Sequence, residues 1–404
     1  MRSHRVWALF TVLAIAVGAT TSVAAQQTPE PTRREIIEQA QAEKVKSLHP
    51  YELTRGERLM NKVEDLTVNG GLHWHQFFES ANHGAGFTLG AGYMHHVSPY
   101  NLLDVRGSYS ILGYQLFEAE FIAPRIFHRR GQLSVLGGYR EATQVAFYGL
   151  GTDSSKNNRT NYLFREPYVS GLMTLWPTRK LLMLRGGVEV AQWTQRPGEG
   201  TFPSIETAYT ASTLPGVGAK VKYLHTQGTV GFDWRPARDY ARRGGLYAVT
   251  LHDYKDNDET LGFRQVDYEV VQHFPILREA WAISLRGLVQ TTMTKSGQEI
   301  PFFLLPSLGG GHNMKGYESD RFRDRNSLLL QGEWRIMVNR FMDTALFYDA
   351  GKVASHTSDL DLNGLTHDYG AGVRFHSPTS TMFRVDVARS PEGIRLVLAS
   401  SAAF

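Results

Sequence analysis

The sequence of 404 residues contains no cysteine. This absence excludes disulfide bonds, thiol catalysis and metal sites with cysteine ligands. The Gly-x-Ser-x-Gly motif of lipase-type hydrolases is also absent. Beyond residue 25 there is no uncharged apolar stretch of about 18 residues, the length that indicates a membrane-spanning helix. We therefore expect neither an enzyme nor a helical membrane protein.

The chain has little net charge as well. It carries 43 Lys and Arg against 39 Asp and Glu, a formal net charge of +4. Two of the basic residues, Arg2 and Arg5, lie in an N-terminal leader. The remainder is near neutral, so the composition gives no indication of nucleic-acid binding.

Residues 1–25 have the features of a signal peptide. Arg2 and Arg5 precede the apolar stretch 6–17, and small residues precede an expected cleavage near Ala25. The leader predicts export. Two outcomes remain open from the leader alone: a protein soluble outside the inner membrane, or a β-barrel of the bacterial outer membrane.

Residues 26–66 are expected to form a short periplasmic linker with an amphipathic helix. Ile36, Ile37, Ala40 and Val45 follow roughly helical spacing, with charged residues between them. A flexible spacer and a docked or membrane-surface helix are equally open interpretations. The segment is too short for a periplasmic domain of any size.

From residue 67 to residue 404 the apolar pattern changes to a period of two, which is typical of strands. No helical segment interrupts this pattern. We predict sixteen strands, at 67–78, 85–97, 101–111, 114–127, 132–148, 161–176, 180–194, 219–234, 244–254, 260–274, 279–294, 326–338, 341–353, 365–377, 380–390 and 393–404. An even number of long strands favours an all-β fold, a 16-stranded antiparallel transmembrane barrel.

The connections and the facing of side chains support a barrel. Tight turns alternate with longer loops, of which 295–325 is the longest, as periplasmic turns and extracellular loops do. In 380–390, Phe383 and Val385 alternate with Arg384 and Asp386. Because side chains alternate across a strand, one face is apolar and the other charged. In a barrel spanning lipid the apolar face lies outside and the charges line the lumen.

Loop 295–325 joins the eleventh and twelfth predicted strands, and its sequence is unusual. Three glycines at 309–311 precede Met314-Lys315-Gly316-Tyr317. Two strands later comes Phe347-x-Asp349-x-Gly351, and the chain ends on an aromatic residue, Phe404. The glycines permit a sharp re-entry of the chain. We expect the side chain of Asp349 to face the lumen, where a partly desolvated ion pair would be stronger than one at the surface.

These motifs resemble those of the outer-membrane assembly and translocation barrels, also described as bacterial surface antigen barrel domains. The superfamily includes the BamA insertase, its relative TamA and the two-partner secretion transporters. In this superfamily the sixth extracellular loop carries a (V/I)-R-G-(F/Y) motif, folds into the lumen and meets the acidic residue of an F-x-D-x-G motif. The resemblance covers about residues 300–404, and terminal aromatics such as Phe404 resemble the signal for barrel assembly.

Carried over by position, Met314, Lys315, Gly316 and Tyr317 form the loop motif. Phe347, Asp349 and Gly351 match the strand motif in full. Lysine replaces the arginine of the superfamily motif, which removes bidentate contact with a carboxylate; Glu333 is then an alternative partner for the loop. Only residues 28–66 precede the barrel, so we expect no POTRA domains.

A second motif, His73-x-His75 with His95 and His96 on the next strand, contains the residue type that most often binds metals. No carboxylate is placed with it by the sequence, so we interpret these side chains as rim and lumen histidines. No metal or other cofactor is expected. The lumen charges, such as Glu333 and Arg374, are likewise interpreted as structural, and we expect them to neutralise one another.

The resemblance implies insertion or translocation of protein or lipid at the bacterial outer membrane, with a seam between the first and last strands. The expected partners are outer-membrane lipid, the assembly machinery that inserts this barrel, and unfolded protein or lipid clients. Two alternatives stay open: a passive channel constricted by loop 295–325, and an anchor or interaction barrel, including a homo-oligomer.

Overall fold

The computed structural model describes residues 32–47, 55–56, 58, 61–62, 73–178, 181–277, 279–400 and 402. The expected signal peptide, most of the expected linker and Phe404 therefore lie outside the described residues. The chain divides into two units, residues 1–56 and 57–404. No helix of the described part is long and apolar enough to cross a membrane.

In the first unit the predicted helix is present as α1 (Arg33–Ser47). An ion pair between Arg34 and Glu38, 3.1 Å apart, joins successive turns. The prediction that this helix is amphipathic is wrong. Val45 follows Ile36 by nine residues, which at 100° per residue is two and a half turns, so the two side chains lie on opposite sides.

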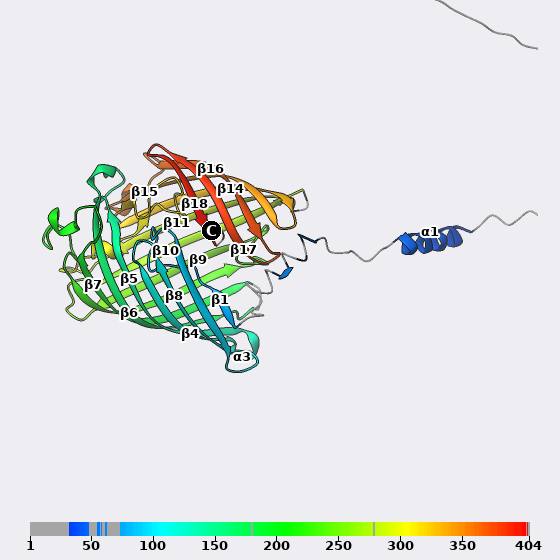
Figure 1. Ribbon diagram of the computed structural model, residues 1–404, viewed down its shortest axis with the longest axis horizontal. Helices are drawn as coiled ribbons and strands as arrows, with labels where there is room; N and C mark the ends of the chain where they lie inside the picture. Colours follow the sequence, from blue (N-terminus) through cyan, green and yellow to red (C-terminus); the bar gives the residue numbers. More distant parts are fainter. Residues whose placement is uncertain are drawn as a thin grey trace, which may run out of the picture. The chain divides into compact units, whose positions relative to one another are not determined.

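The second unit is an antiparallel sheet of sixteen strands that curls into a barrel, with strongly tilted strands (Figure 1). Each strand pairs with the next along the chain, except that β11 pairs with β14 because two short strands form inside the intervening loop. The sixteen strands are β1 (Trp74–Gln76), β2 (Thr88–His96), β3 (Leu102–Ser110), β4 (Gln115–Arg125), β5 (Gly131–Phe147), β6 (Thr160–Leu175), β7 (Leu182–Pro197), β8 (Lys220–Asp233), β9 (Gly244–Asp256), β10 (Phe263–Ile276), β11 (Trp281–Met293), β14 (Asn326–Asn339), β15 (Met342–Ala354), β16 (Thr366–His376), β17 (Thr381–Ser390) and β18 (Gly393–Ala399).

Each predicted strand corresponds to one of these sixteen, which confirms the fold class. Over the described residues β1 and β18 form the two edges of the sheet. Both are short: β1 has three residues and β18 has seven. Residues 67–72 and Phe404, which the prediction placed in these two strands, lie outside the described residues.

The predicted facing of the side chains is also confirmed. Outward positions carry exposed apolar side chains, such as Leu346 on β15, Val387 on β17 and Ile394 on β18. Inward positions carry buried charges, such as Arg384 and Asp386. An apolar outer surface of this kind is stable only against lipid hydrocarbon, because water would leave it unfavourably hydrated.

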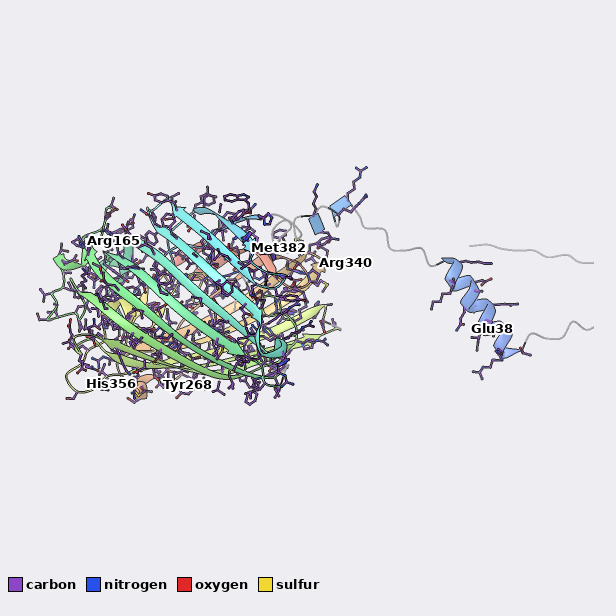
Figure 2. All side chains as sticks on the ribbon, turned by 90° about the horizontal axis from the view of Figure 1, so that it is seen from below. Glu38, Arg165, Tyr268, Arg340, His356 and Met382 are labelled. Carbon is purple, nitrogen blue, oxygen red and sulfur yellow. The ribbon has the colours of Figure 1, made fainter. Side chains whose placement is uncertain are left out.

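The connections differ at the two ends of the barrel. Seven connections lie at the end we call the turn end, and they span 97–101, 126–130, 176–181, 234–243, 277–280, 340–341 and 377–380. Eight lie at the opposite end, the loop end, and the longest of them spans 294–325. Figure 2 shows Arg340 at the turn end and His356 at the loop end.

Candidate functional site

Loop 294–325 folds back among the inward-facing side chains of the barrel. It contains the 3₁₀ helix η3 (Phe302–Leu304) and the short pair β12 (Ser307–Leu308) and β13 (Phe322–Arg323). Between β12 and β13 the chain reverses at Gly309 and Gly310, whose φ angles of 116° and 100° are readily adopted only by glycine. The backbone N–H of Gly310 donates to the carbonyl oxygens of Met314, at 3.1 Å, and Tyr317, at 3.2 Å.

At the tip of this loop Lys315 forms an ion pair with Asp349 on β15. The Nζ atom lies 2.7 Å from Oδ2, and both side chains are 0% exposed. The ammonium also lies 4.3 Å from the centroid of the Phe347 ring. Gln331 on β14 donates to the other oxygen of Asp349, at 3.1 Å, and to the carbonyl oxygen of Asn313, at 2.7 Å. One cation, one amide and one ring thus hold the loop against two strands.

Gly316 and Gly351 permit the close approach between loop and wall. A Cβ atom on Gly316 would lie 2.7 Å from the Cβ of Asp368, and one on Gly351 would lie 2.9 Å from Cδ1 of Leu308. Neither position has room for a side chain without displacement of its neighbours. The carbonyl oxygen of Gly316 accepts a hydrogen bond of 2.9 Å from Ser390 on β17.

The other two residues of the loop motif make apolar contacts, and one of them, Tyr317, also forms hydrogen bonds through its hydroxyl group. Met314 and Tyr317 belong to a buried cluster completed by Leu308, Phe322, Leu329 and Val353. The hydroxyl of Tyr317 also lies 2.5 Å from Oγ1 of Thr366 and donates to the carbonyl of His367, at 3.1 Å. The four motif residues therefore contact β14, β15 and β16 together.

Asp368 on β16 is part of this site, although the sequence analysis did not select it. It pairs directly with Asp349 across β15 and β16, and it is fully buried. Neither of its carboxyl oxygens has a hydrogen-bond partner among the described residues. The site thus places two carboxyl groups beside one lysine. The parity of Asp368 with Arg374, an expected lumen residue on the same strand, is the sequence signal that indicates its inward direction.

Glu333 faces the lumen as expected, and its partners are arginines of the barrel wall. Glu333 does not take the place suggested for it beside Lys315. It binds Arg374 on β16, at 2.6 Å, and lies 3.5 Å from Arg335 on its own strand. Because a guanidinium from each of two strands already surrounds Glu333, the carboxylate is neutralised without the loop lysine.

Glu333 begins a chain of alternating charges that also reaches the loop. Arg374 binds Asp386, and Asp386 accepts a hydrogen bond of 2.6 Å from Arg384. Arg384 in turn donates to the carbonyl oxygen of Gly311, at 2.5 Å. The expectation that lumen charges neutralise one another therefore agrees with these pairs, and the last guanidinium gives the loop a second anchor.

A third set of contacts fixes the loop near the loop end. Glu318 accepts hydrogen bonds from Tyr148 and, at 2.9 Å, from Arg159. Arg321 binds Glu392 in the last hairpin, at 2.7 Å, and donates to the carbonyl oxygen of Ser154, at 2.6 Å. The loop is thus held by the third and the last connections of the loop end.

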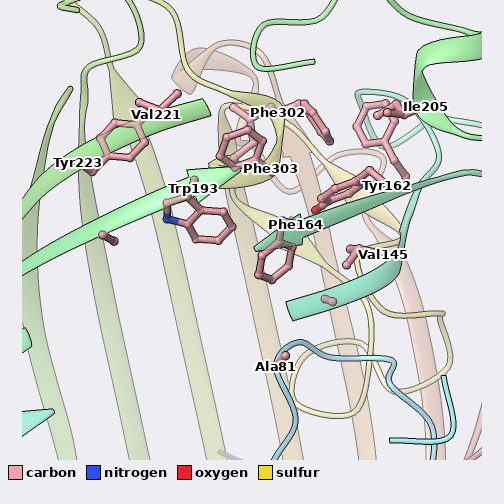
Figure 3. Close-up of a cluster of buried hydrophobic side chains, with 14 of the residues drawn as sticks. Ala81, Val145, Tyr162, Phe164, Trp193, Ile205, Val221, Tyr223, Phe302 and Phe303 are labelled. Atoms are coloured by element: carbon pink, nitrogen blue, oxygen red, sulfur yellow. The ribbon is translucent and has the colours of Figure 1, made fainter. Parts of the chain in front are cut away.

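An aromatic cluster fills the inner side of β5 to β8 near the loop end (Figure 3). Phe303 from the loop stacks on Trp193 with ring centroids 5.2 Å apart, and Phe302 packs edge-on against Tyr162 at 4.8 Å. Ile205 from connection 198–219 joins the same cluster. Loops and wall therefore share one apolar core within the barrel.

At the turn end, connection 234–243 also enters the lumen. The hydroxyl of Tyr240 donates to Asp343 on β15, at 2.8 Å, and lies 2.9 Å from Nε2 of His376 on β16. Arg242 lies 2.5 Å from Asp343. The backbone of Asp239 forms an isolated parallel β-bridge with Ser380, in the connection between β16 and β17. A turn that leaves β8 is thus fixed to strands of a distant part of the sheet.

The histidine motif does not gather as a metal site. Nε2 of His75 lies 2.7 Å from Asp104, a carboxylate that sequence reasoning did not place there, and His73 lies within 3.0 Å of the carbonyl of Met94. The described residues contain no group of three His, Cys, Asp or Glu suited to a metal ion.

Comparison with protein families matches residues 193–392 to the Omp85 superfamily domain. None of the curated proteins matches the chain. Solved structures with a similar fold include BamA from Haemophilus ducreyi lacking POTRA domains 1–3, with a TM-score of 0.58 and 14% identity. CdiB from Escherichia coli gives 0.52 and 11%, and CdiB from Acinetobacter baumannii gives 0.50 and 11%.

These alignments cover 81%, 80% and 77% of this chain, respectively. The chain in turn spans 68% of the BamA chain and 60% and 55% of the two CdiB chains. At such low identities the likeness shows a shared fold, and the family match is limited to residues 193–392. The matched segment holds the tethered loop and the strands β14 to β17 that bind it. Residues 193–392, just under half of the chain, therefore match the Omp85 superfamily domain, and the barrel fold is shared with BamA and CdiB.

Proposed function

We propose that this barrel inserts or translocates polypeptide or lipid at the outer membrane, without covalent chemistry. The observation that carries the proposal is the buried tether of Lys315 to Asp349 within an Omp85 barrel. A tether of this kind fixes a long loop inside the barrel and thereby stabilises one shape of strands β14 to β16, on the side of the sheet that leads to β18.

The edges β1 and β18 are the proposed seam. Unpaired strand edges present free N–H and C=O groups, which attract a further strand and are costly within hydrocarbon. A seam between short edge strands would open more readily than any other junction in the sheet, because short strands are able to form few hydrogen bonds. Clients are proposed to be unfolded barrel proteins or lipids, and the barrel's own insertion is proposed to require an assembly machinery after removal of residues 1–25.

The passive-channel alternative is opposed by the contents of the lumen. The aromatic cluster around Phe302 and Phe303 lies near the loop end, and connection 234–243 enters the lumen at the turn end. A pore that conducts at rest needs a continuous aqueous path. The anchor alternative, including a homo-oligomer, predicts no effect on the folding of a client protein, and so does the channel. The folding assay described next therefore distinguishes both alternatives from insertion.

The test is a folding assay with purified barrel in vesicles. An unfolded porin is added, and its folding rate is followed with and without the barrel. We expect acceleration that is lost in Asp349→Ala and kept in Asp258→Ala, a change of an exposed acid in connection 257–262. Acceleration unaffected by Asp349→Ala would contradict the role of the tether. No acceleration by the native barrel would reject the proposal for protein clients, and a lipid-transfer assay with the same variants would test lipid clients.

A further inference from the structure

The charged residues of the connections are distributed unequally between the two ends of the barrel. By sequence, the seven connections of the turn end contain ten Lys and Arg but two Asp and Glu. The eight connections of the loop end contain seven Lys and Arg and thirteen Asp and Glu. The whole chain is close to neutral, so this contrast is a property of the ends and not of the composition.

Part of the turn-end charge has no acidic partner. Arg235 and Arg238 bind Asp233, whereas Arg129 and Arg130 are exposed and have no acidic partner among the described residues. Arg125, at the end of β4, is exposed as well and lies over the ring of Tyr100, 4.1 Å from its centroid. These three arginines are neighbours around one turn, and their positive charge is available to a partner outside the chain.

Exposed apolar side chains project from the same end. Phe127 and Leu277 are each 62% exposed and lie on turns 126–130 and 277–280, and Leu181 is also exposed. Phe127, with φ 46°, and Leu277, with φ 48°, adopt the left-handed conformation that is disfavoured for residues with a Cβ atom. The backbone thus holds large apolar side chains outward beside cationic ones.

Aromatic rings complete this end of the barrel. Arg238 lies over the Trp176 ring at 4.7 Å, and Trp234 packs edge-on against Tyr247 at 4.9 Å. Rings at this level are typical of the girdle where a barrel leaves hydrocarbon and meets lipid headgroups. The unpaired arginines therefore lie at the height of the headgroups of one leaflet.

We propose that the turn end is a binding surface for anionic phospholipid headgroups. Arginine binds phosphate through several N–H donors, and the exposed apolar residues of the same turns enter the adjacent acyl region. A bilayer leaflet is the partner that meets both features at once, since it is already in contact with the apolar wall of the barrel. The inference rests on the barrel spanning a bilayer and is independent of any insertase activity.

The test measures which lipid gathers around this end. Barrel is reconstituted into phosphatidylcholine vesicles that contain dansyl-labelled phosphatidylglycerol or, in parallel, dansyl-labelled phosphatidylcholine. Energy transfer from tryptophan, with Trp176 and Trp234 at the turn end as donors, reports local enrichment of the labelled lipid. We expect stronger transfer to phosphatidylglycerol, and a preference that weakens as salt is raised.

The variant Arg125→Gln, Arg129→Gln, Arg130→Gln is expected to lower this preference about tenfold or more, because each basic residue near an anionic surface contributes about a fivefold change. The matched control changes three exposed basic residues of the loop end: Arg196→Gln, Lys220→Gln, Lys222→Gln. It should retain the native preference. Equal transfer to both lipids in the native barrel would overturn the proposal and favour an acidic protein as partner. Equal losses in both variants would overturn it too, since net charge would then explain the effect.

Discussion

Lys315 takes the place that arginine holds in the superfamily motif, and its single ammonium binds one carboxylate. With both partners fully buried, removal of Lys315 leaves two carboxyl groups without a cation, and removal of Asp349 leaves the ammonium without its hydrogen-bonded acceptor in a medium of low dielectric constant. We expect Lys315→Ala and Asp349→Ala each to destabilise the folded barrel by about 3–5 kcal/mol. The measurement is the midpoint of heat-induced loss of the compact form on gels.

The double variant tests whether the two residues act as a pair. Lys315→Ala combined with Asp349→Ala should cost little more than either single change, because the second substitution removes the charge that the first one stranded. Fully additive losses would show that the two side chains act independently and would reject the tether.

Asp368 gives a prediction of the opposite sign. Its carboxyl group lies directly across from Asp349, and one lysine faces the pair. Two buried carboxyl groups with one cation either leave a negative charge in excess or force one of them to hold a proton, and both outcomes cost free energy and disfavour the docked loop. Asp368→Asn removes the second ionisable group at nearly constant shape, and an amide is able to donate to Asp349. We expect stabilisation of about 1–3 kcal/mol in the same thermal assay.

The control for this prediction is the same substitution at a balanced position. Asp386→Asn removes a carboxylate that two arginines share, Arg374 and Arg384, so it should destabilise the barrel. If both Asp-to-Asn changes shift stability in the same direction, the charge imbalance at Asp368 is not the cause.

At the scale of elements, the contacts of Glu318 make the docking of the loop sensitive to acid. Burial opposes ionisation of this side chain, but the hydrogen bond from Tyr148 and the charge of Arg159 outweigh it and lower the carboxyl pKa from its ordinary value of 4.5. The unfolded chain then takes up a proton at higher pH than the folded barrel does. The contribution is complete above about pH 4.5 and is lost as the pH falls below that value.

The native barrel should therefore lose thermal stability as the pH falls below about 4.5, and Glu318→Gln should lose less over the same interval. Glu299→Gln, an exposed position in the same loop, is the control and should follow the native curve. A native pH dependence retained in full by Glu318→Gln would show that other acidic groups determine it.

The sequence is sufficient to predict the strands and the direction of their side chains. It is insufficient to predict which side chains of adjacent strands meet. Alternation assigns Asp349, Asp368 and Glu333 to the inner face, because parity along one strand determines direction. Which inward side chains meet depends on the register of adjacent strands and on the path of the loop. For this reason the pairing of Asp349 with Asp368 was missed. The sequence left Glu333 with two possible partners, the loop lysine and the other lumen charges, and the structure shows the second, Arg374.

The entry of connection 234–243 into the lumen was not predicted, for a related reason. Four arginines and a proline in a turn indicate exposure by composition, yet Tyr240 and Arg242 are buried. Their partners, Asp343 and His376, lie more than 100 residues later, and no local pattern connects such distant positions. The motif at 314–317 was placed correctly in the lumen because the resemblance to a family supplied the long-range information that local patterns lack.

For the whole molecule, the lumen is obstructed at two levels by separate elements. Loop 294–325 contributes Phe302 and Phe303 to the cluster near the loop end, and Tyr240 and Arg242 attach connection 234–243 to β15 and β16 near the turn end. Removal of the loop alone leaves the second obstruction in place. We expect deletion of 296–324 to give small or flickering currents in planar bilayers, and the native barrel to give none.

Adding Tyr240→Ala and Arg242→Ala to the loop deletion should raise the conductance well above that of either change alone, because both obstructions are then released. The two substitutions without the deletion should leave the barrel closed, since the aromatic cluster remains. A large, steady current from the deletion alone would show that connection 234–243 does not obstruct the lumen. Steady conductance of the native barrel would favour the passive channel over the proposed insertase, because a resident pore would then need no displacement of loop or turn.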